Sequence, residues 1–552
     1  MLNSNNFKFL YVACASILFC SAVQTYAQTT TEPSAIERTI PKKLLERSSE
    51  LAVQTDLPDA EVNRALTGRF VLGAVHVSGS TVFSQSQLAA DYEPYLATEV
   101  GDTQLQQIVT RITERYRSAG YFLSYAMLPA QDVRAGVVRI DVIEGRIDQF
   151  EVSGAEGGER ALNSIASPLL DGRPLRTTLL ERVLGLMRDL PGFYIADARI
   201  GRHENDLAEH ELTVEVVRND VRAIAYADNR GTVDDARARF YTSISHSSLM
   251  TTGDDFRLSG FAIPGSNFQY LYGQGAYVLP IGRQGWLLEF SGSYGDQKQV
   301  SFGEVTNGRS TNIAAELSYP VIRSRAFTAV AKIAVNDWFS TSVNDDAQVR
   351  RDRLRVVRVG LGLDRTLPSQ INLDIWLAQG LGFNAATRPG DPISSRPDAG
   401  GKFTKVNVAL QLQQPIGTDL KVRLAAAGQV SSRPLLSIEE FALGGNSIGR
   451  AYDFNALTGD HGFGGSLELA YMLGDQFGGL KQVELFSYVD GGMVFQSGDG
   501  NGPGPDQSLT SAGGGARFTL DRFRVSAEAG IPIEAIENHR SIRAFLSVST
   551  VF

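Results

Sequence analysis

The stretch Gly444–Gly462, GGNSIGRAYDFNALTGDHG, decides how the rest of the chain is interpreted. Five of its nineteen residues are glycine, and apolar residues do not alternate along it. We therefore predict a tightly turning loop between strands rather than a strand. Arg450 lies in its middle, beside Tyr452 and Asp453. A guanidinium group there suits a bidentate contact with a carboxylate, although an ordinary surface loop remains an alternative.

The composition excludes several classes of protein. The chain has 552 residues, 43% hydrophobic and 20% charged, with 55 glycines and a net charge of −9. These proportions are typical neither of a disordered chain nor of a helical membrane protein. The negative charge argues against a general nucleic-acid binder, so we expect no nucleic-acid partner.

Residues 1–27 are predicted to be a cleaved signal peptide. Lys8 precedes the apolar stretch Phe9–Val23, which is too short for a comfortable membrane span. A short membrane anchor is the alternative. Cys14 and Cys20 both lie in this segment, so the exported chain is predicted to have no disulfide.

Residues 28–67 are polar and are predicted to form an N-terminal helix and linker. Pro41 precedes Lys42–Val53, and proline is favoured in the first turn of a helix. This segment is expected to connect the leader to the folded part of the chain.

From Gly68 the chain repeats a pattern with a period of about 75 residues. Each copy has a strand that ends in Val-Ser-Gly, an amphipathic helix that ends in glycine and aromatic residues, and a closing alternating strand. The order β-α-α-β-β therefore occurs twice, in predicted domains over 68–145 and 146–220. Small sheets of this kind have free edges that can accept an extended peptide, although blunted edges would make the domains plain spacers.

The remainder, 221–552, is predicted to contain sixteen strands and no convincing helix. Along Gln482–Val494 the side chains alternate in character. Val483, Leu485 and Val489 share one face, and Glu484, Phe486, Tyr488 and Asp490 share the other. An apolar outside and a polar inside are typical of a transmembrane β-barrel.

The connections between these strands alternate between short and long, as in outer-membrane barrels with short periplasmic turns and long external loops. The predicted short connections are Pro280–Gly285, Asp364–Gln370, Gln414–Asp419 and Leu520–Arg522, and the long ones are Gly295–Ser310, Asp337–Asp352, Gly380–Lys402, Gly444–Gly462 and Gln496–Ser508.

This pattern places Gly444–Gly462 between strands eleven and twelve and Asp490 on the inner face of strand thirteen. We therefore expect the loop to fold into the barrel and Arg450 to pair with Asp490. Such a buried pair holds one conformation, and the loss of either partner is costly.

At these residues the chain resembles the outer-membrane transporters of two-partner secretion, the haemolysin secretion/activation type. Gly444–Gly462 resembles the loop motif of that family, GG…(V/G)RGY followed by GDxG, with Ala451 in place of the usual glycine. Phe486–Gly492 resembles its FxDxG strand, and Ser511–Leu520 its late GxGxRF strand. The two repeats resemble its POTRA domains, which are small peptide-binding domains of the periplasm. The resemblance leaves open whether 28–67 forms the plug helix of that family.

The resemblance implies a mainly β protein of the outer membrane with a 16-stranded barrel. It implies translocation of a secreted exoprotein with an N-terminal secretion domain, with or without activation, and contact with outer-membrane lipid. It implies no catalytic residues, cofactor or metal. The motif residues carried over are Gly444, Gly445, Ser447, Gly449, Arg450, Tyr452, Gly459, Asp460 and Gly462 in the loop and Phe486, Asp490 and Gly492 on the barrel wall.

Three other functions are compatible with parts of the sequence. An outer-membrane assembly or insertion factor of the same superfamily is the main alternative, but such proteins usually have more than two periplasmic repeats. A plain solute porin would not need the repeats. An enzyme is disfavoured because none of the six histidines has the spacing of a metal site, and Gly444–Gly449 lacks the lysine of a phosphate-binding loop.

Overall fold

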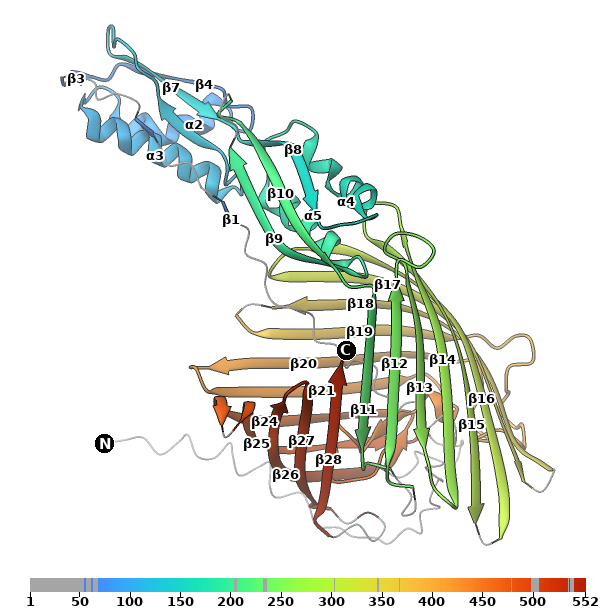
Figure 1. Cartoon of the computed structure of the whole chain (residues 1–552). Helices are drawn as coiled ribbons and strands as arrows, with labels where there is room; N and C mark the ends of the chain where they lie inside the picture. Colours follow the sequence, from blue (N-terminus) through green and yellow to red (C-terminus); the bar gives the residue numbers. More distant parts are fainter. Residues whose placement is uncertain are drawn as a thin grey trace, which may run out of the picture.

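The computed structural model describes residues 54–55, 61–62, 68–202, 206–231, 236–301, 303–344, 347–366, 368–477, 479–497, 506–534, 536 and 541–552. The predicted signal peptide over 1–27 and the predicted helix over Lys42–Val53 lie outside these residues. Figure 1 shows an arm of two small α+β units standing on one end of a closed barrel. None of the helices among the described residues is long and apolar enough to cross a bilayer.

The first unit has the predicted order β-α-α-β-β, and helix α3 carries most of its core. Leu105, Ile108 and Ile112 are fully buried at the helical spacing that the sequence suggested. The sheet has the order β2-β6-β7-β4. Its elements are β3 (Phe70–Val71), β4 (Ala74–Ser78), α2 (Gln85–Tyr92), η1 (Glu93–Tyr95), β5 (Glu99–Val100), α3 (Asp102–Ser118), β6 (Tyr125–Leu128) and β7 (Val137–Ile143).

The second unit repeats this order and has its own hydrophobic core. Helix α5 buries Leu180, Val183 and Met187 against the sheet, whose order is β1-β9-β10-β8. Its elements are β8 (Arg146–Ser153), α4 (Glu159–Ala166), η2 (Ser167–Leu170), α5 (Thr177–Asp189), β9 (Phe193–Arg202) and β10 (Glu209–Arg218).

The repeated Val-Ser-Gly motif has the same structural reason in both units. Gly79 and Gly154 have φ of 82° and 73°. A Cβ there would lie 2.2 Å from the carbonyl oxygen of Val142 and 2.1 Å from that of Val216, respectively. Only glycine therefore fits where the first strand of each unit passes the last.

One edge of each sheet is partly covered by the segment that precedes the units. Strand β1 (Gln54–Thr55) pairs in parallel with Arg199 and Ile200 of β9, and β2 (Glu61–Val62) pairs in parallel with β6. The edges predicted to be free thus carry short added strands, and β1 pairs with two of the ten residues of β9.

The rest of the chain forms a closed antiparallel barrel of sixteen strands, as predicted. The last strand pairs with the first through five residue pairs, Ile224–Asp228 with Ser547–Val551. The strands are β11 (Val221–Asp228), β12 (Arg239–Ser247), β13 (Asp255–Ile263), β14 (Phe268–Ile281), β15 (Trp286–Ser301), β16 (Glu304–Arg323), β17 (Phe327–Asn344), β18 (Ala347–Arg365), β19 (Gln370–Gly380), β20 (Thr404–Ile416), β21 (Leu420–Ser431), β24 (His461–Phe477), β25 (Leu480–Phe495), β26 (Gln507–Leu520), β27 (Phe523–Pro532) and β28 (Arg543–Val551).

Two of the predicted long loops are strands. Gly295–Ser310 and Asp337–Asp352 were predicted to be long loops, but β15–β16 and β17–β18 pair through most of both segments. Backbone pairing in these hairpins extends past the apolar part of the barrel wall, where outward side chains become polar.

Helix α5 of the second unit docks on two turns of the barrel. The guanidinium of Arg182 donates to the carbonyl oxygens of Pro320 at 2.9 Å and Gln284 at 3.3 Å. Arg323 forms a two-pronged contact with Asp189, at 2.7 and 3.0 Å. The unit is therefore joined to the barrel by polar contacts at the end where the short turns lie.

Candidate functional site: the loop held inside the barrel

The chain between β21 and β24 folds into the barrel as a compact loop. It contains η3 (Ser437–Glu439) and a small hairpin of β22 (Phe441–Leu443) and β23 (Leu457–Gly459). Part of Gly444–Gly462 is therefore strand, because β23 and the start of β24 lie within it, contrary to the prediction of a loop throughout. We call Gly444–Ala456, between the two short strands, the loop tip.

The glycines of the loop tip allow its backbone to turn back on itself. Gly444, Gly445 and Gly449 have φ of 105°, 111° and 79°, a region that L-residues rarely adopt. A Cβ on Gly444 would lie 2.0 Å from the carbonyl oxygen of Asp453. The first two amides donate to the carbonyls of Ile448 and Gly449, which closes the turn.

The carboxylate of Asp490, on the inner face of β25, holds the backbone of the loop tip. One oxygen accepts from the amide of Gly449 at 3.0 Å and the other from the amide of Arg450 at 3.2 Å. The hydroxyl of Ser511 on β26 donates to the first oxygen. Asp490 is 3% exposed, so these donors satisfy a carboxylate that is removed from water.

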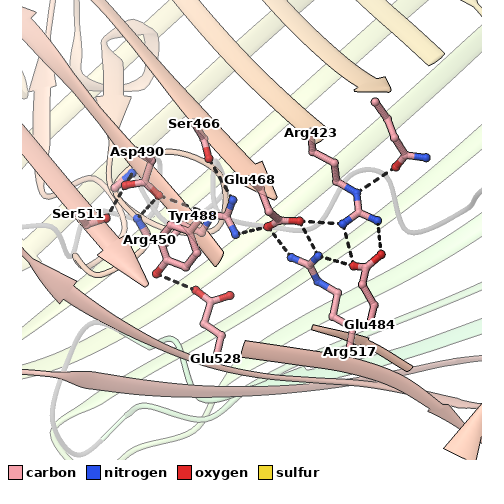
Figure 2. A network of polar contacts seen from close by, with 12 residues as sticks. Arg423, Arg450, Ser466, Glu468, Glu484, Tyr488, Asp490, Ser511, Arg517 and Glu528 are labelled. Atoms are coloured by element: carbon pink, nitrogen blue, oxygen red, sulfur yellow. Dashed lines mark hydrogen bonds and ion pairs between the residues drawn. The ribbon is translucent and has the colours of Figure 1, made fainter. Parts of the chain in front are cut away.

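The guanidinium of Arg450 makes its shortest contacts with residues other than Asp490. It donates to Glu468 at 2.7 Å and to the hydroxyl of Ser466 at 3.0 Å, both on β24. Its Nε lies 3.5 Å from Asp490, an ion pair without a hydrogen bond. The ring of Tyr488 lies under it, 4.0 Å from the guanidinium carbon. The structure thus brings Arg450 and Asp490 together, but Glu468 is the principal side-chain partner of Arg450 (Figure 2).

The two residues after Arg450 fit closely against the wall. Ala451 is fully buried, and its φ is not positive, so the backbone accepts alanine in place of the motif glycine. The hydroxyl of Tyr452 lies within hydrogen-bond distance of the carbonyl oxygens of Thr510 and Glu534, at 2.8 and 2.7 Å.

Beyond Arg450 the charges continue as a network along the wall (Figure 2). Glu468 also accepts from Arg517 at 2.7 and 2.8 Å and from Arg423 at 2.8 Å. Glu484 accepts from Arg423 through two bonds of 2.7 Å and from Arg517 at 2.9 Å. The two carboxylates are 3% and 5% exposed, so three arginines compensate two buried negative charges.

The base of the loop has a second arginine anchor. Asp460 is fully buried and accepts from Arg396 at 2.8 Å, from the amide of Leu435 at 2.7 Å and from the amide of Ser497 at 2.8 Å. Arg396 belongs to the connection between β19 and β20. Burial tends to lower the pKa of Arg396, but the carboxylates of Asp460, Asp398 and Glu440 raise it above its ordinary value.

The remaining motif residues have packing roles or are exposed. Ser447 is exposed at the loop tip. Gly459, Gly462 and Gly492 lie where a Cβ would meet Phe495 at 2.8 Å, Phe441 at 2.2 Å and Phe463 at 2.5 Å, respectively. Phe486 lies under Arg517, with the guanidinium carbon 3.7 Å from the ring centre.

The loop tip also contacts the first and last strands of the barrel. Arg230, which follows β11, donates to the carbonyl oxygen of Arg450 at 2.9 Å and to Glu528 on β27 at 2.6 Å. Arg543 on β28 pairs with Asp453 of the loop tip. The loop tip therefore connects the two sides of the seam where the barrel closes.

Sequence reasoning missed Glu468 as the partner of Arg450, and it missed Arg396, Arg423 and Arg517 as anchors. A signal was present for Glu484, which alternation placed on the inner face. The same alternation along Gly464–Met472 puts Glu468 opposite the apolar face of Leu467 and Leu469. The pairing among them depends on which strands are neighbours, and no local spacing encodes that.

Family models match both parts of the chain. Residues 211–518 match the haemolysin secretion/activation protein ShlB/FhaC/HecB, and residues 70–145 match a POTRA domain of the ShlB type.

Individual proteins give consistent matches at low identity. The outer membrane transporter CdiB of Escherichia coli O6:K15:H31 is 22% identical over 515 residues, 89% of this chain and 83% of its own length. The heme/hemopexin transporter protein HuxB of Haemophilus influenzae (strain 86-028NP) is 22% identical over 393 residues, 68% of this chain and 67% of its own.

The fold matches the solved structure of CdiB from Escherichia coli with a TM-score of 0.74 at 20% identity, over 92% of this chain and 94% of that one. CdiB from Acinetobacter baumannii matches with a TM-score of 0.67 at 17% identity, over 91% and 95%. The family match covers more than half of the chain. The chain therefore belongs to the haemolysin secretion/activation protein family, as an outer-membrane transporter whose barrel lies in the membrane and whose POTRA region faces the periplasm.

Proposed function

We propose that the chain captures an unfolded exoprotein in the periplasm through its two α+β units and passes it through the barrel to the cell surface. The partner is a secreted protein with an extended N-terminal secretion domain. Folding of the exported segments outside would favour outward movement, so the proposal needs no nucleotide, cofactor or catalytic step.

The observation that carries the proposal is the pairing of β1 and β2 with the sheets of the two units. Strands β9 and β6 already accept short extended segments in parallel. Because main-chain hydrogen bonds give such pairing little dependence on sequence, an unfolded partner can bind in the same way. On β9, most residues have no strand beside them on that edge among the described residues.

The loop tip is proposed to be the functional centre of the barrel. Its glycine-rich backbone carries considerable conformational entropy, and Asp490 and Glu468 hold it in one position inside the lumen. The motif residues from Gly444 to Gly462, with Phe486, Asp490 and Gly492, are therefore assigned to loop anchoring and translocation, not to catalysis.

Photo-crosslinking in the full chain tests the capture step. A photoreactive side chain replaces Ala196, an exposed residue of β9, in cells that co-express a candidate exoprotein. We expect an adduct with the N-terminal domain of the exoprotein. The matched control replaces Arg160, an exposed residue of α4 in the same unit, and should give no adduct. Export without any adduct at Ala196 would contradict capture at this edge.

A further inference from the structure

The outer surface of the barrel carries a group of basic side chains on three of four neighbouring strands, β15, β16 and β18. On β15–β18 the outward side chains are apolar near the middle of the wall. Phe290 is 51% exposed, Ile313 70%, Val335 49% and Val359 53%. Exposed apolar residues at this density are typical of a lipid-facing belt.

Aromatic residues lie at both ends of this belt. At the periplasmic end Trp286 stacks on Tyr319, with ring centres 4.4 Å apart. Toward the outside, Tyr294 and Phe339 are outward-facing and are 48% and 37% exposed. The nine residues from Trp286 to Tyr294 span about 20 Å along the membrane normal for a tilted strand, close to the height of the apolar band of such barrels.

Charged residues follow directly beyond the outer aromatic residues. Two positions past Tyr294 and Phe339, Asp296 pairs across the sheet with Arg309, Arg309 with Thr341, and Thr341 with Arg351. The head groups of the external leaflet lie at this height. We call the outward charged residues at and around this height the rim patch: Lys298, Arg309, Arg351, Arg353 and Arg355, with Asp296, Asp337 and Asp391 as their acidic neighbours. Arg353 lies opposite Phe339, and Arg355 pairs across the sheet with Asp337, two positions nearer the belt.

The arginines of the rim patch have weak or shared counter-charges. Arg309 lies 3.4 Å from Asp296, and its side chain is 69% exposed. Arg351 lies 3.9 Å from Asp391 and is 50% exposed. Arg353 and Arg355 share Asp337, at 3.6 and 3.1 Å. Exposed pairs at these distances contribute little stability, so the fold does not account for Arg309, Arg351 and Arg353. Arg355 differs, because it also donates to the carbonyl oxygens of Phe383 and Asn384, at 3.0 and 2.7 Å.

The net charge of the rim patch is opposite in sign to the net charge of the whole chain. Its five cations exceed its three carboxylates, so it is positive, whereas the chain has a net charge of −9. Arginine is the side chain best suited to phosphate, because its planar group donates two parallel hydrogen bonds.

We propose that the rim patch binds the phosphate groups of lipopolysaccharide in the external leaflet. The acyl chains would lie on the apolar belt below, and the lipid A phosphates would lie against Arg309, Arg351 and Arg353. Basic residues at the membrane interface bind anionic head groups in this way. The lipid would hold the β15–β18 hairpins at a defined height in the membrane.

Binding to defined lipids tests this proposal. The purified full chain in detergent is titrated with diphosphorylated lipid A, monophosphorylated lipid A or phosphatidylglycerol, and bound lipid is counted by native mass spectrometry. We expect the tightest binding for the diphosphorylated form and a decrease of about tenfold in the triple variant Arg309→Gln, Arg351→Gln, Arg353→Gln. The affinity should also fall with added salt.

A matched variant separates a local site from overall charge. Arg365→Gln, Arg522→Gln, Arg524→Gln removes three exposed arginines at the periplasmic end of the barrel and should bind lipid A as the wild type does. The single variant Arg309→Gln, which disturbs one weak contact, should lower affinity about threefold. Equal binding by the wild type and the rim variants, or an equal loss in the periplasmic-end variant, would overturn the proposal.

Discussion

The loop tip and the joint between α5 and the barrel are both held by arginines, but their partners differ. Inside the barrel, the guanidinium of Arg450 donates to a carboxylate and a hydroxyl, and the carboxylate of Asp490 accepts hydrogen bonds from backbone amides of the loop tip. At the joint, Arg182 donates to two backbone carbonyl oxygens, and Arg323 pairs with Asp189, a carboxylate that is partly exposed. Without Arg450, two arginines are left to compensate two buried carboxylates and the loop tip loses its side-chain link to the wall, whereas a carbonyl near the surface can turn to water. Removing an arginine of the loop tip is therefore expected to reduce secretion more than removing Arg182 from the joint.

The largest effect is expected from Arg450→Ala. The alanine removes the guanidinium that donates to Glu468 and stacks on the ring of Tyr488. The side chain at position 450 then no longer holds the loop tip against the wall. Glu468 keeps Arg517 and Arg423, so the cost is that of a lost charge-assisted hydrogen bond, about 2 kcal/mol. We expect secretion to fall at least about tenfold while the barrel still inserts. Exported protein is measured at matched levels of transporter in the outer membrane. Arg433→Ala, an exposed arginine of the same loop, is the control and should secrete normally.

A double-mutant cycle distinguishes the two partners of Arg450. The sequence alone suggests that Arg450→Ala and Asp490→Ala remove one interaction and are not additive. The geometry instead predicts coupling of about 2 kcal/mol between Arg450 and Glu468, and about 1 kcal/mol or less between the side chains of Arg450 and Asp490. Thermal unfolding of the purified single and double variants gives both values. Stronger coupling to Asp490 than to Glu468 would contradict this assignment.

At the joint we expect a moderate effect from Gly185→Leu. A Cβ at Gly185 would lie 2.7 Å from the side chain of Arg323, so a leucine would push the pair of Arg323 and Asp189 apart. Secretion should fall a few fold, because the joint also keeps the contacts of Arg182 and an opened ion pair costs about 1 kcal/mol when partly exposed. Thr178→Leu, on the exposed side of the same helix, is the control. An unchanged rate for Gly185→Leu would show that the joint need not stay closed.

The smallest effect is expected from Arg182→Ala. Its hydrogen bonds end on carbonyl oxygens and the hydroxyl of Tyr319, and their loss costs about 1 kcal/mol. Secretion should stay within about twofold of the wild type. A loss as large as that of Arg450→Ala would remove the distinction between the two regions.

The difference between side-chain partners inside the barrel and backbone partners at the joint also explains which contacts the sequence could predict. Alternation of inward and outward side chains predicted sixteen strands, because a barrel wall separates lipid from a polar interior at every strand. The Asp490 contact was predicted because the motif places this inward carboxylate opposite a glycine-rich loop that carries an arginine. The contacts of Arg182 leave no such signal, since any residue can supply a carbonyl oxygen.

The outer ends of the hairpins were predicted wrongly for a related reason. Gly295–Ser310 and Asp337–Asp352 are rich in polar residues, since beyond the membrane the outer wall also meets water. Polarity alone does not distinguish a strand there from a loop. Glu468, Arg423 and Arg517 lie on strands far apart in the sequence, so their network follows from barrel closure rather than from spacing.

A covalent replacement for the Arg450 anchor tests the central claim most directly. A Cβ at Gly464 on β24 would lie 2.9 Å from the side chain of Ile448 in the loop tip, within reach of a disulfide. Cys14 and Cys20 lie in the predicted leader, so Ile448→Cys with Gly464→Cys is expected to provide the only pair in the exported chain. In the Arg450→Ala background, we predict that the oxidised pair restores most secretion and that reduction abolishes it again. No recovery at complete oxidation would contradict the claim that Arg450 acts by holding the loop tip in place.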